Sequence, residues 1–178
     1  RIAKIIKGLR SFSRNSEGDP MSISSAGAVI ESTLEFCQAR FKASSIVFKM
    51  SPIPDAYIKC RESQLAQVIL NLLNNSFDAV SGLDEKWISM DILDKESTIE
   101  IAVTDSGKGI PATVVEKMMF PFFTTKDVDK GTGLGLSISK GIIEEHGGKI
   151  HYDASCSNTR FVVTLPKAAE MRDYKVAS

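Results

Sequence analysis

Apolar positions repeat every three to four residues in four segments of the chain, and this period predicts helices. The four segments cover residues 1–13, 25–40, 63–80 and about 134–146. A shorter helix is expected over residues 111–119, because proline at its start is well tolerated in a first helical turn. Gly147 and Gly148 follow the last segment and provide a C-cap signal.

Short runs of β-branched and aromatic residues predict strands between these helices. Six strands are expected, at residues 46–50, 57–60, 86–93, 98–103, 149–154 and 160–165. The third and fourth are joined by Asp94-Lys95-Glu96-Ser97, which has the length and composition of a hairpin turn. The chain therefore mixes helices and strands over a length typical of one domain with a terminal extension.

The helix expected at residues 63–80 carries an unusual polar stripe. At 100° per residue its polar positions are Gln64, Gln67, Asn71, Asn74, Asn75 and Asp78. The opposite side is formed by Leu65, Val68, Ile69, Leu72, Leu73, Ser76, Ala79 and Val80. A simple solvent-facing stripe would favour Lys and Glu, whereas Asn is a poor helix former. Carboxamide oxygens are ligands that suit Mg²⁺, so the stripe indicates a functional surface.

Glycines alternate with larger residues in GTGLGL, residues 131–136, directly before the last long helix. Gly131, Gly133 and Gly135 allow backbone turns that side chains would obstruct. Successive N–H groups in such a loop, together with the positive end of a helix dipole, form an anion site suited to triphosphate. Taken alone, the pattern also fits a flexible loop before an amphipathic helix.

Two further stretches contain candidate ligand contacts. Asp105 ends a predicted strand and precedes Gly107 and Gly109, so its carboxylate could accept a hydrogen bond from an amino group of a base. The alternative is an ordinary Asp-Gly turn. Lys126 ends PFFTTK and could offer a charge to phosphate, within a polar segment at residues 124–130 that resembles a lid. The three phenylalanines before it, at positions 120, 122 and 123, are expected to contribute in part to the core.

Composition narrows the class of protein further. Lys plus Arg and Asp plus Glu both number 22, and this balance gives no support for nucleic-acid binding. No apolar run approaches the length of a membrane span, and the first residue, Arg1, suggests a fragment of a longer protein. Cys37, Cys60 and Cys156 are scattered without a CxxC pair, which fits a reducing cytoplasm.

Four motifs stand in an order that resembles the N, G1, F and G2 boxes of sensor histidine kinases. They are QVILNLLNNSFDAV, DSGKGI, PFFTTK and GTGLGLSISKGIIEEHGG, and the similarity covers residues 22–167. RIAKIIKGLRSFSR resembles the end of the preceding dimerisation and phosphotransfer domain. The resemblance implies a two-layer α/β sandwich, the Bergerat fold, with a mixed sheet on one layer of helices. It divides the chain into a remnant helix and linker (1–20), a catalytic ATP-binding domain (21–168) and a frayed tail (169–178).

The resemblance also implies roles for matching residues. Asn75 would hold Mg²⁺, Asn71 would contact phosphate or metal-bound water, and Asp105 would bind the adenine amino group. The other residues expected to bind nucleotide are Asp78, Gly107, Gly109, Ile110, Thr124, Thr125, Lys126, Gly131, Thr132, Gly133, Leu134, Gly135, Leu136 and Thr159. Asn158 stands where glycine is commoner in the family, which leaves the start of that strand less well defined.

The implied reaction is transfer of the ATP γ-phosphoryl group to a histidine. Relatives that hydrolyse ATP place a glutamate where this chain has Asn71, and an amide cannot take a proton at neutral pH. His146 is expected to be structural at a helix end, and His151 lacks a phosphoacceptor pattern. The acceptor is therefore expected outside this segment. The alternatives are a serine/threonine kinase on the same fold and a non-catalytic nucleotide-binding signalling module.

The resemblance implies the cofactors and partners as well. ATP and Mg²⁺ are the expected cofactors. The expected partners are the dimerisation and phosphotransfer domain, in the same or a partner chain, and the receiver domain of a response regulator. The full-length protein is expected to be a dimer with this domain in the cytoplasm, and the segment leaves membrane attachment of the parent protein open.

Overall fold

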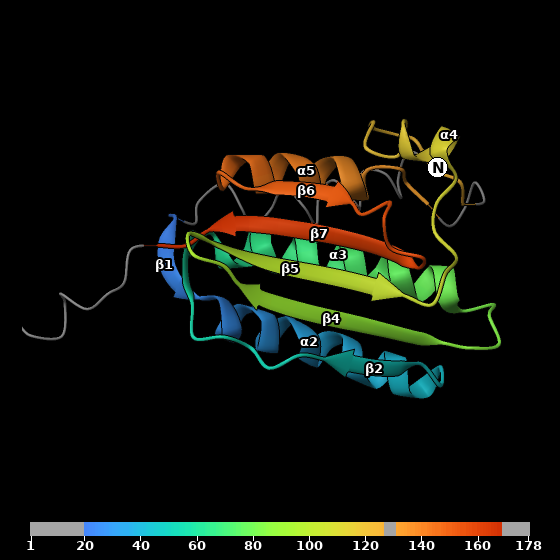
Figure 1. Ribbon diagram of the computed structural model, residues 1–178, viewed down its shortest axis with the longest axis horizontal. Coiled ribbons are helices and arrows are strands. Elements are labelled where there is room, and N and C mark those ends of the chain that lie inside the picture. The colour runs from blue at the N-terminus through green and yellow to red at the C-terminus, as the bar shows by residue number, and fades with distance from the viewer. Residues whose placement is uncertain (1–19, 127–130, 169–178) are drawn as a thin grey trace, which may run out of the picture.

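The computed structural model describes residues 20–126 and 131–168. The helix expected at residues 1–13 and the tail at 169–178 lie outside the described residues, as does most of the segment expected to be a lid. Within the described part, a five-stranded sheet lies against a layer of helices (Figure 1). Buried apolar residues of both form the core.

The main sheet has five strands in the order β2-β4-β5-β7-β6. These are β2 (Val47–Met50), β4 (Trp87–Asp94), β5 (Thr98–Asp105), β7 (Thr159–Pro166) and β6 (Lys149–Tyr152). β2 pairs with β4 in parallel, and the other pairs are antiparallel. The β4–β5 pairing confirms the predicted hairpin, and the mixed sheet confirms the predicted fold class.

Three helices lie side by side behind the sheet in Figure 1. They are α2 (Ala26–Ala43), α3 (Glu62–Val80) and α5 (Gly135–Glu145), with α3 in the middle. Each presents an apolar stripe to the sheet, and Leu73 of α3 and Ile143 of α5 are fully buried. Burial of such a side chain stabilises the fold by roughly 1.5–3 kcal/mol. The central position of α3 is what allows it to contact elements on both sides.

A second, two-stranded sheet was not expected. β1 (Ser22–Ser25) pairs antiparallel with β3 (Tyr57–Cys60), so the strand predicted at residues 57–60 forms but lies outside the main sheet. The sequence of β1, SISS, has little of the β-branched and aromatic character that predicts a strand, and β1 is ordered by pairing with β3. Ser25 then caps α2, because its hydroxyl accepts a hydrogen bond from the Ala28 amide.

The helix predicted at residues 111–119 is shorter than expected. The α-helical part is α4 (Ala112–Val115), and the following residues form turns up to Phe120. None of the helices in the described residues is both long and apolar enough to cross a membrane.

Candidate functional site

The polar side of α3 faces α5 and the segment that ends at Lys126. The Asn71 carboxamide donates a hydrogen bond to the hydroxyl of the buried Ser139 on α5, at 3.0 Å. Gly135, the first residue of α5, lies so close to Asn71 that a side chain there would collide with the carboxamide. The glycine at this position therefore lets the start of α5 approach α3.

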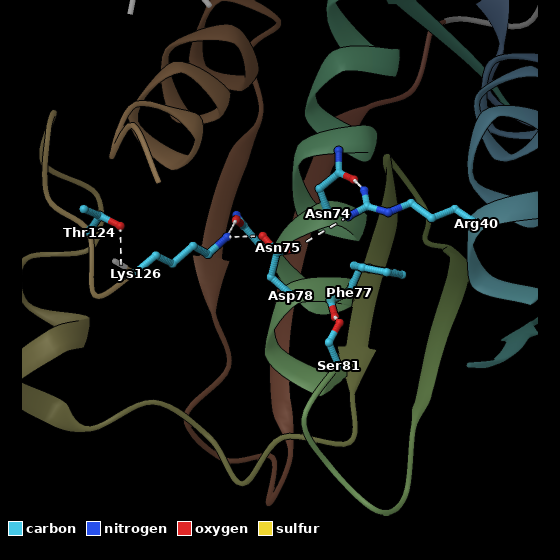
Figure 2. A network of polar contacts seen from close by, with 8 residues as sticks. All are labelled: Arg40, Asn74, Asn75, Phe77, Asp78, Ser81, Thr124 and Lys126. Atoms are coloured by element: carbon cyan, nitrogen blue, oxygen red, sulfur yellow. Dashed lines mark hydrogen bonds and ion pairs between the residues drawn. The ribbon is translucent and has the colours of Figure 1, made fainter. Parts of the chain in front are cut away.

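Lys126 connects the segment after α4 to the same side of α3 (Figure 2). Its Nζ lies 2.7 Å from Asp78 Oδ2 and 3.1 Å from Asn75 Oδ1. The backbone of Lys126 also donates to Thr124 Oγ1 at 3.1 Å, which fixes the turn before the lysine. Two oxygens of α3, one charged and one neutral, thus hold a cation.

Arg40 approaches α3 from α2 and was not predicted to contribute to the site. Its guanidinium donates to Asn74 Oδ1 at 2.7 Å and lies 3.7 Å from the centre of the Phe77 ring. A nitrogen of the same group is 3.8 Å from Asp78 Oδ1, so Asp78 stands between Arg40 and Lys126 (Figure 2). Two cations and one carboxylate leave this corner with one net positive charge, which favours an anionic ligand.

Asp105 ends β5 and is almost completely buried, with 2% of its surface exposed. Its Oδ1 accepts a hydrogen bond from the Gly107 amide at 2.8 Å, and the hydroxyls of Ser76 and Thr159 lie near the carboxylate. Burial raises the pKa of the Asp105 carboxyl, and the Gly107 amide and these two hydroxyls lower it by a smaller amount. A buried acceptor of this kind discriminates strongly between ligands that donate to it and ligands that do not.

Gly107 is tightly enclosed beside this carboxylate. A Cβ at position 107 would lie 2.7 Å from both Asp105 Oδ1 and Thr159 Oγ1, closer than side chains tolerate. The Gly107 carbonyl accepts from the Thr159 amide at 3.1 Å and from Asn158 Nδ2 at 3.2 Å. Asn158, which departs from the family pattern, therefore holds the loop after β5 in place.

The glycine loop approaches the segment after α4. Gly133 has a φ of +68°, and a Cβ there would collide with the backbone of Phe122. Phe122 itself has a φ of +66° and is 68% exposed, and Phe120 is 61% exposed. The expectation that the three phenylalanines contribute in part to the core is therefore confirmed by Phe123, which packs against the core, whereas Phe120 and Phe122 do not contribute.

α3 brings the predicted site residues together in two groups. Asn75 belongs to the cation-holding group with Asp78 and Lys126, and the next residue, Ser76, lies near the Asp105 carboxylate. The sequence placed Ser76 on the apolar side of the helix, which is where it lies, but did not identify its contact with Asp105.

The burial of other predicted residues differs from the sequence pattern in two places. Gln64, placed in the polar stripe, is buried, and Ala79, placed opposite, is exposed. Thr125 and Thr132 are exposed, and Leu136 packs against the core.

The sequence around this site is similar to that of a known protein family. Residues 60–169 match the family described as histidine kinase-, DNA gyrase B- and HSP90-like ATPases. The chain belongs to this family. Proteins of this ATPase family bind a nucleotide, so this domain is a nucleotide-binding domain. The candidate contacts are the group around Lys126 and the group around Asp105, which α3 joins.

Similar proteins include sensor kinases from several bacteria. The sensor kinase CckA of Brucella abortus is 33% identical over 96% of this chain and 19% of its own length. The sensor protein FixL of Bradyrhizobium diazoefficiens is 33% identical over 96% of this chain and 34% of its own. This chain thus spans about a fifth to a third of the length of these relatives.

Solved structures show the same fold. The catalytic domain of histidine kinase ThkA superposes with a TM-score of 0.73 at 30% identity, covering 83% of this chain and 95% of that one. A second structure, of ThkA in complex with the response regulator protein TrrA, gives 0.76 at 26% identity over 97% and 49% of the two chains. These likenesses agree with the histidine kinase branch of the ATPase family.

The donor set at the corner of α3 fits a magnesium ion. Asn75 Oδ1 and Asp78 Oδ2 both accept a hydrogen bond from the Lys126 ammonium, so these two oxygens of α3 already face a positive charge. Mg²⁺ in nucleotide sites is typically held by one or two protein oxygens, with phosphates and water completing the shell. No group of three or more His, Cys, Asp or Glu able to hold a metal occurs in the described residues, so a fully protein-ligated metal is not indicated there.

His146 has a structural position in this ATPase-family domain, as the sequence predicted. It is buried at the end of α5, with Nδ1 2.7 Å from the Ile142 carbonyl and Nε2 accepting from the Arg61 amide at 3.0 Å. Both ring nitrogens are thus engaged, and the ring connects the end of α5 to the start of α3.

Proposed function

We propose that this chain is the ATP-binding catalytic domain of a sensor histidine kinase, which transfers the γ-phosphoryl group of magnesium-bound ATP to a histidine outside residues 1–178. The observation that carries the proposal is the junction on α3: Asn75 contacts Lys126 at 3.1 Å, and its neighbour Ser76 is buried beside Asp105. One helix thereby links a corner suited to phosphate and metal with a carboxylate suited to a base.

Each group has a distinct task in this proposal. Asp105 accepts a hydrogen bond from the adenine amino group, with Thr159, Gly107, Gly109 and Ile110 beside the base. Lys126 and the loop from Gly131 to Leu136 hold the phosphates, assisted by Asn71, Thr124, Thr125 and Thr132, while Asp78 holds the Lys126 ammonium in place. Asn75 holds Mg²⁺, which neutralises charge on the phosphates. Phosphoryl transfer depends mainly on positioning and charge neutralisation, so no covalent nucleophile is required here.

The contacts of Asn71 argue against hydrolysis of ATP, and those of His146 argue against this histidine as the phosphoacceptor. The Asn71 amide donates to Ser139 and cannot act as a general base for hydrolysis. The two ring nitrogens of His146 are occupied within the fold, so this histidine is a poor phosphoacceptor. We therefore place the acceptor on a dimerisation and phosphotransfer domain of the same or a partner chain, and a response regulator receiver domain downstream.

The division of the chain that we propose is the one implied by the resemblance to sensor histidine kinases. Residues 21–168 form the catalytic domain, residues 1–20 the end of the dimerisation helix and its linker, and residues 169–178 a tail. The ThkA complex with the response regulator protein TrrA supports the kind of partner, because its kinase chain is similar to 97% of this one.

Calorimetric titration with ATP, with and without Mg²⁺, tests the proposed roles. Asp105→Ala should weaken binding of adenosine, ADP and ATP alike, because the base contact is shared by all three. Asn75→Ala should reduce chiefly the magnesium-dependent part of ATP binding. Equal affinity of both variants and the wild-type chain would refute these assignments.

Phosphotransfer in trans tests the reaction. Residues 1–178 are mixed with labelled ATP and a separately produced dimerisation and phosphotransfer domain of a sensor kinase. The expected product is phosphate on that domain that is stable in base and labile in acid. Acid-stable phosphate would indicate the serine/threonine kinase alternative, and phosphate on His146 would contradict the structural role of that residue.

A further inference from the structure

The loop Ser106–Ile110, which carries three of the proposed base contacts, is fixed at both ends. Its first half is held by hydrogen bonds between Gly107 and residues Asp105, Asn158 and Thr159. At its other end, the Ile110 amide donates to the hydroxyl of Tyr152 at 3.0 Å. Tyr152 belongs to neither the predicted nor the proposed nucleotide contacts.

Tyr152 reaches this loop from the edge of the sheet. It is the last residue of β6, pairs with Phe161 of β7, and packs its ring on that phenylalanine with ring centres 5.8 Å apart. Tyr152 and Ile110 are both half-buried against the main core. The ring is thus held by packing, which leaves the hydroxyl at a defined place beside the loop.

The Tyr152 hydroxyl lies close to the backbone of Gly109. A Cβ at position 109 would lie 2.9 Å from the Tyr152 oxygen, and Gly109 has a φ of +84°, which side-chain-bearing residues rarely adopt. The phenol oxygen therefore occupies the space that a side chain would take. Its hydrogen bond to the next residue, Ile110, stabilises this unusual turn of the backbone.

We propose that Tyr152 is a positioning residue of the nucleotide site, which holds Gly109 and Ile110 where the base of ATP packs against them. The inference rests on the proposed function, because it concerns the same site. Tyr152 acts through the loop: its hydroxyl fixes the far end, as Asp105 and its partners fix the near end. A loop held at both ends is already ordered before the ligand arrives, which lowers the entropic cost of binding.

Tyr152→Phe removes one oxygen and retains the ring. We expect the dissociation constants for adenosine, ADP and ATP to rise by the same factor, about twofold to tenfold, as for loss of one hydrogen bond. The matched control is Tyr57→Phe, on β3 in the small sheet, which should leave all three constants unchanged. An effect that grew with the number of phosphates would overturn the proposal, because the loop is assigned to the base.

Amide hydrogen exchange measured by NMR reports on the contact itself. In Tyr152→Phe the Ile110 amide should exchange faster, whereas the Gly107 amide, held by Asp105, should keep its protection. Unchanged exchange at Ile110, or faster exchange with unchanged nucleotide affinity, would overturn the positioning role. If the wild-type chain bound no adenine compound, the proposed function would fail together with this inference. If the wild-type chain and Tyr152→Phe bound equally, this inference alone would fail.

Discussion

The Lys126 ammonium lies 2.7 Å from the Asp78 carboxylate, across the space between α3 and the segment after α4. The pair is partly exposed, with 32% and 40% of the two side chains accessible, so its net stabilisation is small, about 0–1 kcal/mol. Its value lies in placement, because the same ammonium contacts Asn75. A positive charge is thereby held beside the proposed metal ligand.

Replacing Lys126 with methionine tests this placement. The variant should bind ADP and ATP more weakly, by about tenfold to a hundredfold, because hydrogen bonds to charged groups contribute about 1.5–3 kcal/mol. Adenosine, which lacks phosphates, should bind as to the wild-type chain. Calorimetry with the three ligands separates these results, and a loss shared equally by adenosine would contradict a phosphate role for Lys126.

The buried state of Asp105 predicts a pH-dependent stability. Because its folded-state pKa is raised, the folded protein binds a proton more readily than the unfolded chain. Stability from this group is therefore present below the unfolded pKa, near 3.8, and is lost as pH rises through the raised folded value. Above that window the buried charge destabilises the fold.

Asp105→Asn removes this charge while keeping the size of the side chain. Urea unfolding as a function of pH should show a shallower fall of the unfolding free energy above pH 3.8 in the variant than in the wild-type chain. Adenine nucleotide binding should fall at the same time, which is a common exchange of stability for function at a ligand site. Identical pH profiles for the two proteins would show that Asp105 titrates normally.

Features encoded within a few neighbouring residues were predictable from the sequence. Asp105 at a strand end is an example, as is the turn that separates β4 from β5. Ser76 shows the limit, because a serine on a buried helix face gives no signal of its partner until β5 packs beside it. Arg40 was missed for the same reason: its contact with Asn74 joins residues 34 positions apart in the sequence.

Exposure of apolar residues was the other unpredictable feature. Phe120 and Phe122 are of a residue type that is common in cores, yet both side chains are largely exposed in the segment after α4. Phe36 of α2 is likewise 77% exposed. A pattern of apolar residues reports how much surface could be buried, whereas the direction of each side chain depends on tertiary packing.

Gly133 should tolerate substitution poorly. Alanine there would meet the Phe122 backbone in a conformation with positive φ, so Gly133→Ala should lower the unfolding free energy by about 1–3 kcal/mol. Gly141 is the matched control, because it lies within α5 and nothing stands within 4 Å of a Cβ added there. Gly141→Ala should raise stability by about 0.5–1 kcal/mol, since alanine is the better helix former. Equal effects in urea unfolding would contradict the tight approach at Gly133.

The connection made by His146 predicts a large effect on stability without an effect on phosphotransfer. His146→Ala would remove the ring nitrogen that accepts from the Arg61 amide and the ring contact to the Ile142 carbonyl, which keeps its bond from the backbone amide of residue 146. Loss of the hydrogen-bond partner of a buried group costs about 1–3 kcal/mol. His151, exposed on β6, is the control, and His151→Ala should change stability by less than about 0.5 kcal/mol. Below the unfolding temperature, both variants should still phosphorylate a histidine domain supplied in trans. Loss of acid-labile phosphate in His146→Ala, at a temperature where circular dichroism shows an intact fold, would instead assign this histidine to the reaction.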